Sequence, residues 1–130
     1  MHFEVKLEKT LQDRLWSYDL FDILVDGIEV GNIVFRRAPS HLVRICGHIG
    51  YHIDSPFQGH RYAYRALQAI MGHIQQLGYT SILVTCDPQN LPSKKTIEHF
   101  HILNYEEVAI ADPEYPNQDR MAIYEIEVKP

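Results

Sequence analysis

The N-terminal half of the chain contains four segments whose apolar, aromatic and branched positions predict β-strands. These segments are residues 3–8, 18–25, 28–36 and 41–53. The pair Asp26-Gly27 is a typical hairpin turn between the second and third segments. In the fourth segment, Gly47 and Gly50 mark candidate positions for a bulge or for a close approach of two backbones.

The spacing of apolar residues changes to that of a helix after residue 60. The recurring apolar positions are Ala63, Ala66, Leu67, Ile70, Ile74 and Leu77. They predict a helix over residues 61–77, and Gly78 stands where a C-terminal glycine ends such a helix. The continuously apolar segment 81–86 is typical of a strand buried on both faces. A strand, a helix and a parallel strand are therefore expected between residues 41 and 86.

The last third of the chain predicts one helix and two strands. Asn90 is a candidate N-cap for a helix over residues 91–101. Strands are predicted over residues 105–111 and 121–128, joined by the acidic loop 112–119. The predicted order β-β-β-β-α-β-α-β-β is that of an α+β or mixed α/β fold.

Composition excludes several classes of protein. The 130 residues are 45% hydrophobic and 22% charged, which predicts one folded domain over residues 1–130 and excludes intrinsic disorder. The 12 Lys and Arg against 17 Asp and Glu give a net charge of −5, with 8 histidines counted as neutral. Because the basic residues do not cluster, neither nucleic acid nor an anionic membrane is expected as the main partner.

The cysteines and the N-terminus predict a cytoplasmic location. Cys46 and Cys86 are the only two cysteines, which suggests buried thiols in a reducing compartment rather than a disulfide framework. The N-terminal sequence lacks the apolar run of a signal peptide, and no stretch is apolar and long enough for a membrane helix.

The junction before the first helix carries the clearest binding signal. Gln58-Gly59-His60 precede the helix, and the first turn of a helix offers unpaired N–H groups and the positive end of the dipole to an anion. A P-loop is excluded because no Gly-Lys-Ser/Thr follows, and the glycines are too few for a dinucleotide fingerprint. A loop glycine before an ordinary helix is the alternative interpretation.

Two motifs, taken together, resemble those of a known protein family. The chain reads Gln58-Gly59-His60-Arg61-Tyr62-Ala63 after a strand of G-x-I-G-Y form, and Asn90-Leu91-Pro92-Ser93 after the apolar strand. Residues 47–108 thereby resemble the GNAT superfamily of acyl-CoA-dependent N-acetyltransferases, with its Arg/Gln-x-x-Gly-x-Gly/Ala loop and its Asn-x-x-Ser helix start. Arg61 departs from the pattern because the family usually has glycine there, although a cationic side chain can itself contact phosphate.

The resemblance implies a GNAT-like fold, with a central mixed β-sheet, splayed parallel strands and two main helices. Acetyl-CoA would be the cosubstrate, its pantetheine pairing with the exposed edge of the first splayed strand. A backbone N–H near Ile53 would stabilise the oxyanion. The residues implied in binding acetyl-CoA are Ile53, Gln58, Gly59, His60, Arg61, Tyr62, Ala63, Asn90 and Ser93.

The resemblance also implies direct attack of an amine on the thioester, which needs a base and an acid. His52 is the candidate base, because it would lie close to the thioester. For the acid, Ile97 occupies the position of the family's usual tyrosine. Tyr105, His99, Ser93 or water are the candidates to replace it.

Two further interpretations remain open. Ile97 and Arg61 favour a non-catalytic acyl-CoA-binding module, and a small interaction domain without a CoA site is the other alternative. A metal site is not expected, because His48 and His52 would lie roughly 13 Å apart along a strand, too far for both to reach one ion.

The amine acceptor is not identified, but its site is expected to be open. Residues 10–17 are too few to hold the two helices that the family usually has between its first strands. An open site suits a bulky acceptor, such as a polypeptide N-terminus or a lysine, or completion by a second copy in a homodimer. The acidic loop 112–119 would attract a cationic amine there, or be a solvated turn.

Overall fold

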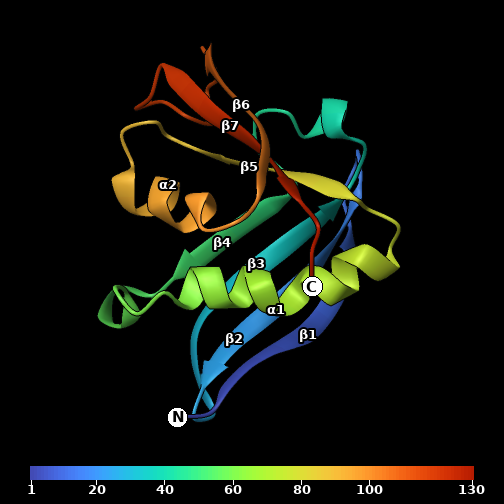
Figure 1. Ribbon diagram of the computed structural model, residues 1–130, viewed down its shortest axis with the longest axis vertical. Helices are drawn as coiled ribbons and strands as arrows, with labels where there is room; N and C mark the ends of the chain where they lie inside the picture. The colour runs from blue at the N-terminus through green and yellow to red at the C-terminus, as the bar shows by residue number, and fades with distance from the viewer.

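The computed structural model describes all 130 residues as two antiparallel sheets and two helices, in the predicted order (Figure 1). The strands are β1 (Phe3–Gln12), β2 (Ser17–Val25), β3 (Ile28–Arg37), β4 (Ile49–Ile53), β5 (Ser81–Cys86), β6 (Ile102–Ala109) and β7 (Arg120–Glu127). The helices are α1 (Tyr62–Gln76) and α2 (Leu91–Glu98). Neither helix combines the length and the apolar character that a membrane span requires.

The first sheet has the order β1-β2-β3-β4. The β2–β3 hairpin turns at Asp26 and Gly27, whose φ angles of 51° and 80° lie in the left-handed region. Strand β1 extends to Gln12 and β2 begins at Ser17, so only a short turn joins them. The prediction that no helices fit between these strands is confirmed.

The second sheet has the order β5-β7-β6 and also consists of antiparallel pairs. It meets the first sheet where the His48 N–H donates to the Leu83 carbonyl, 2.8 Å away. Beyond that point β4 and β5 run alongside each other and diverge (Figure 1). The predicted splayed pair is therefore present, but the predicted central mixed sheet is divided into two antiparallel sheets whose backbones hydrogen-bond to each other at this apex.

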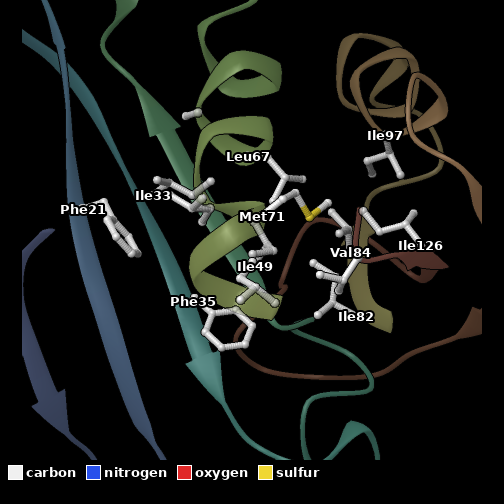
Figure 2. Close-up of a cluster of buried hydrophobic side chains, with 14 of the residues drawn as sticks. Phe21, Ile33, Phe35, Ile49, Leu67, Met71, Ile82, Val84, Ile97 and Ile126 are labelled. Atoms are coloured by element: carbon white, nitrogen blue, oxygen red, sulfur yellow. The ribbon is translucent and has the colours of Figure 1, made fainter. Parts of the chain in front are cut away.

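One apolar core fills the space between the sheets and both helices. It contains 18 buried residues. Leu67 and Met71 of α1 lie between the side chains of the first sheet and those of the second, including Val84 (Figure 2). Ile97 of α2 points into the same core. This packing fixes α1 and α2 relative to the splayed strands.

Two predicted elements are shorter than the sequence indicated. The expected strand over residues 41–53 is a strand only from Ile49, because residues 40–42 form a 3₁₀ turn and Gly47 has a φ of +78°. A Cβ on Gly47 would lie 3.1 Å from the Leu83 carbonyl oxygen, so the backbones approach closely at the apex. The second helix ends at Glu98, and the following strand begins at Ile102 to pair with β7.

A buried carboxylate ties the first sheet to α1. Asp19 on β2 has no exposed surface and accepts two-pronged hydrogen bonds from Arg37 of β3, at 2.8–3.1 Å. Thr10 of β1 and His73 of α1 lie 2.8 Å from the same carboxylate. Four elements therefore converge on one side chain.

Candidate functional site

A cleft of about 590 Å³ lies along β4, the start of α1 and the start of α2. None of its 16 lining residues is an aspartate or a glutamate. Two are the cations Arg61 and Lys95, and two are the histidines His52 and His99. In a chain of net charge −5, this surface is thus locally positive and suited to an anionic ligand.

One wall of the cleft is a strand edge that pairs with no other strand. The backbone N–H of Arg36 donates to the His48 carbonyl, and that of Asp54 donates to the Val30 carbonyl. The backbone N–H and C=O groups of the even-numbered residues of β4 therefore point towards β3. By the alternation of an antiparallel ladder, the N–H and C=O groups of Tyr51 and Ile53 face the opposite way. This edge can pair with an extended ligand as an added strand would.

The start of α1 forms the second wall. Arg61 is its N-cap residue and provides no side-chain cap, and the first helical hydrogen bond is donated by the Arg65 N–H. The N–H groups of Tyr62, Ala63 and Tyr64 are therefore left unpaired by the helix, and all three residues line the cleft. Together with the helix dipole they can bind an anion.

The loop before α1 is shaped by two positive φ angles. Gly59 has a φ of +89° and Arg61 has a φ of +61°. A non-glycine residue in this region carries strain of about 1 kcal/mol. The family pattern has glycine at the position of Arg61, and the left-handed backbone there gives the physical reason. Gln58 closes the loop by donating from its side-chain amide to the Ile53 carbonyl, at 3.0 Å.

The third wall is the start of α2. Asn90 caps the helix by accepting from the Ser93 N–H at 3.2 Å, so the predicted cap is present. The Tyr51 hydroxyl donates to Ser93 Oγ at 3.0 Å and bridges β4 to α2 across the cleft. Burial raises the pKa of Tyr51, and its hydrogen bond to Ser93 partly offsets this effect.

The structure brings together most residues that the sequence singled out for binding acetyl-CoA. Those that line the cleft are Ile53, Gln58, Gly59, Arg61, Tyr62, Ala63, Asn90 and Ser93. His60 does not line it, and its ring stacks on Tyr62 with a centroid distance of 5.3 Å. Tyr105 also lies outside the cleft, on β6, and its hydroxyl donates to Glu107.

His52 lies on the edge of the cleft with its ring directed to the face of the sheet opposite α1. Ile49, on the same strand, is buried in the core, and strand alternation places the side chains of residues 50, 52 and 54 on the other face. His52 Nε2 lies 3.1 Å from Asp54 Oδ1, and 67% of the His52 side chain is exposed. A carboxylate that orients an accessible imidazole is an arrangement suited to proton transfer.

His48 has a structural position, at the apex of the splay. Its side chain is 1% exposed, and Nδ1 accepts a hydrogen bond from the Leu83 N–H at 2.9 Å. Its other ring nitrogen therefore carries the proton and donates to the Ala38 carbonyl at 2.8 Å. Burial lowers the pKa of His48, which favours this neutral form.

Arg36 and the loop 112–119 lie near the apex, on the face of the first sheet to which the His52 ring points. The Arg36 guanidinium extends across Gly50, where a Cβ would lie 3.0 Å from Nη2, and donates to the Gly47 carbonyl. Tyr115, from the loop, lies close to Arg36 and Cys46, and burial raises the pKa of its hydroxyl. The acidic loop thus lies on the side of β4 opposite the cleft's helical walls.

Several cleft residues were missed from the sequence. Lys95 and Thr96 follow Pro92 at helical spacing and line the same wall as His99, which the sequence singled out only as a candidate acid. Tyr51 was not singled out as a site residue, although strand alternation places it on the same face as Ile53. In each case the available signal was periodicity, which cannot identify the partner that an element faces.

Neither a reactive Cys86 thiolate nor a cluster of metal-ligating side chains is found in this structure. Burial raises the pKa of Cys86 to about 11, so this thiol stays protonated. No group of three or more histidine, cysteine, aspartate or glutamate side chains is placed to hold a metal ion.

Comparisons with known proteins agree with the geometry. The family profile of the acetyltransferase (GNAT) domain matches residues 3–102. A comparison with curated proteins finds no match. Solved structures with a similar fold include the ribosomal L7/L12 α-N-protein acetyltransferase RimL in complex with coenzyme A, which is 20% identical with a TM-score of 0.64.

Two other solved structures show the same likeness. One is a GNAT-family acetyltransferase from Bacillus anthracis, 24% identical with a TM-score of 0.62. The other is the microcin C7 self-immunity acetyltransferase MccE with acetyl-CoA and AMP, 16% identical with a TM-score of 0.65. The three alignments cover 84–85% of this chain but only 61–66% of those proteins.

Proposed function

This chain belongs to the GNAT acetyltransferase family, and from that premise we propose that it binds acetyl-CoA in the cleft and transfers the acetyl group to a primary amine. The observation that carries the proposal is the cleft itself. It joins a free strand edge to an uncapped helix N-terminus on a surface without carboxylates. Those are the features that an extended amide chain ending in a diphosphate requires.

In this proposal the pyrophosphate binds the first turn of α1. The N–H groups of Tyr62 and Ala63 donate to it, and the Arg61 and Lys95 side chains contribute positive charge. Gly59 leaves open space around its backbone, since nothing lies within 4 Å of a Cβ built there. Pantetheine then pairs with the strand edge at Tyr51 and Ile53, and its thioester lies beside the Ile53 N–H. Asn90 supports this geometry by capping α2.

The reaction is a direct transfer within a ternary complex. The amine nitrogen attacks the acetyl carbon while His52 removes a proton from that nitrogen. The Ile53 N–H donates to no protein group, and it stabilises the negative charge that develops on the thioester carbonyl oxygen. The carbon–sulfur bond then breaks, and its electron pair leaves with sulfur, which takes up a proton.

The acceptor approaches His52 from the face opposite α1, near the acidic loop 112–119. The short turn between β1 and β2 leaves no helical wall there, which suits a bulky acceptor such as a polypeptide N-terminus or a lysine. RimL is named for such a substrate, the ribosomal protein L7/L12.

Because Cys46 and Cys86 are both free, we place this activity in the reducing cytoplasm.

The experiment that tests the proposal is titration calorimetry with acetyl-CoA and with CoA, followed by a turnover assay over a panel of amines and peptides. Binding of both ligands with one site per chain, together with release of free thiol in the presence of an acceptor, is the expected result. Absence of binding at millimolar ligand would overturn it and favour an interaction domain without a CoA site.

A non-catalytic CoA-binding module is the second candidate, and Ile97 favours it. This residue is 1% exposed and packs in the core, so α2 provides no tyrosine hydroxyl at that position. The module predicts acetyl-CoA binding with no thiol release for any acceptor. The turnover assay therefore separates the two candidates.

Two variants of Arg61 test the phosphate site. Arg61→Gly is expected to raise the free energy of unfolding by about 1 kcal/mol, because glycine adopts a φ of +61° without strain. The same change is expected to weaken acetyl-CoA binding about tenfold, because a charge-assisted contact with phosphate is lost. Denaturant titration and calorimetry measure the two effects.

Arg61→Ala is the matched control. It removes the charge but keeps a Cβ in the left-handed region, so affinity should fall without a gain in stability. Equal affinity of the wild type and both variants at low salt would show that Arg61 does not contact the phosphates.

A further inference from the structure

Strand β1 forms the edge of the first sheet that is opposite to β4 (Figure 1). It pairs only with β2, whereas the cleft lies along β4 at the other end of the sheet. The strand has 10 residues and no proline, and its first regular stretch ends at a bulge between Leu7 and Lys9. An open edge of this kind is a template for pairing with another strand, unless its side chains prevent it.

The backbone groups that this edge offers belong to alternate residues. The Asp26 N–H donates to the His2 carbonyl at 2.8 Å, so these two residues form a hydrogen-bonded pair at the end of the β1–β2 ladder. The register of the two strands repeats this arrangement at Glu4 and Lys6. The N–H and C=O groups of residues 3, 5 and 7 therefore point away from β2, to the outside of the sheet.

The side chains of β1 differ between the two faces of the sheet. Phe3 and Val5 pack against the apolar core, and Leu7, on the same face by strand alternation, is 45% exposed. Glu4 and Lys6 are exposed on the opposite face, and neither makes an ion pair within the chain. The edge thus has an uncovered leucine on one face and two charges of opposite sign on the other.

Two copies of β1 can pair in antiparallel fashion about a twofold axis, and the position of that axis decides which side chains meet. With the axis at Val5, this residue lies opposite its own copy, and Phe3 lies opposite Leu7. On the other face, Glu4 of each copy lies opposite Lys6 of the other. The outward backbone groups of the two strands then meet, and every charge faces one of opposite sign.

Neighbouring registers bring like charges together. With the axis at Glu4, the two copies of this residue face each other. With the axis at Lys6, the two lysines meet and Glu4 lies opposite Glu8. Like charges directly opposite each other destabilise a strand pair. An axis at Leu7 would require pairing across the bulge. Charge complementarity therefore selects one register between two copies of this edge.

We propose that two copies of this chain form a homodimer by antiparallel pairing of their β1 strands about Val5, which joins the two first sheets into one continuous sheet. Leu7 of each copy then packs beside Phe3 of the other. His52 and the strand edge of β4 stay accessible, because they lie at the far edge of each sheet. The inference goes beyond the proposed function and does not depend on it, since this pairing requires neither acetyl-CoA nor an acceptor.

Sedimentation equilibrium of the full chain, from micromolar to submillimolar concentration, tests the dimer, and charge reversal tests its register. Glu4→Lys and Lys6→Glu each place like charges opposite each other, so each is expected to weaken the homodimer about tenfold. In an equimolar mixture of the two variants, every lysine again faces a glutamate. A heterodimer should therefore form with about the wild-type affinity, and the double variant with both changes in one chain should also regain it.

Glu29→Lys is the matched control. Glu29 is exposed on β3 and makes no ion pair, and its reversal changes the net charge as much as Glu4→Lys does. Because β2 separates β3 from the edge, the affinity of the dimer should not change.

Two results would contradict the proposal. The first is wild-type protein that stays monomeric over the whole concentration range. The second is a wild-type dimer whose affinity is unchanged by either reversal, or is lowered by both and not restored on mixing, because the copies would then pair through another surface. Calorimetry with acetyl-CoA should give the same affinity for wild type and every variant, so a failure of the dimer and a failure of the proposed function are distinguishable.

Discussion

His52→Gln is expected to lower kcat for acetyl transfer by about a hundredfold, with the affinity for acetyl-CoA unchanged. General base catalysis typically contributes a factor of about 10² to 10⁴, and the exposure of His52 favours the lower end of that range. Glutamine preserves the size of the side chain and can donate to Asp54, but it cannot take a proton from the amine. Steady-state kinetics with a saturating acceptor and calorimetry with acetyl-CoA measure the two quantities.

Two comparisons sharpen this prediction. Asp54→Asn should lose less activity than His52→Gln, because Asp54 orients the ring without touching the amine, and the double variant should lose no more than His52→Gln. His101→Gln is the matched control, since His101 Nδ1 also faces a carboxylate, that of Glu127 at 3.6 Å, but lies outside the cleft. An unchanged kcat in His52→Gln would remove this residue from the mechanism.

Asp19→Asn is expected to lower the free energy of unfolding by about 3 kcal/mol at neutral pH. Removing one member of a buried ion pair leaves its partners without a counter-charge. Here Arg37 and His73 both lose the carboxylate that links β2 to β3 and α1. For a domain stabilised by about 5–15 kcal/mol, such a loss is large. Urea denaturation followed by circular dichroism measures it.

The effect of Asp19 depends on pH in a defined direction. Burial by itself would raise the pKa of Asp19, but the hydrogen bonds from Arg37, His73 and Thr10 outweigh it and hold the pKa below its usual value. A lowered folded-state pKa contributes stability that is fully present above the unfolded value of about 3.9 and is lost as pH falls through the folded value. Wild type and Asp19→Asn should therefore converge in stability in acid.

Asp22→Asn is the control for this prediction. Asp22 lies on the same strand, with its side chain on the other face of the sheet, and this side chain makes no hydrogen bond or ion pair. Its replacement should change the free energy of unfolding by less than about 0.5 kcal/mol. A similar loss in Asp19→Asn and Asp22→Asn would mean that the buried network does not stabilise the fold.

Local patterns predicted the elements well because each depends on nearby residues. Helical spacing and Gly78 located α1 to within one residue at each end. The loop from Gln58 to Ala63 and the cap at Asn90 were also readable, since both are made by short-range backbone geometry and side-chain hydrogen bonds. The strand ending at Ile53 was predicted with the correct end but the wrong beginning, because the turn at Gly47 follows from its contact with Leu83 in the other sheet.

Interactions between segments far apart in the sequence could not be predicted from local patterns. The sequence placed His48 and His52 on one predicted strand, yet His48 is held at the apex by Leu83 and Ala38, 35 and 10 residues away. Asp19 appeared as one acidic residue among 17, and only the packed structure shows Arg37 and His73 around it. The bond between Tyr51 and Ser93 spans 42 residues and leaves no local signature.

The amino-acid sequence by itself determined the order of the elements, the position of the loop and uncapped start of α1 and the family to which the chain is similar, because periodicity, capping and loop motifs are local. Only the tertiary structure decided how the two sheets part at His48, which face His52 presents and which hydroxyls meet across the cleft. Those features arise from packing one apolar core between two sheets and two helices, and that packing sets distances between residues that no local pattern relates.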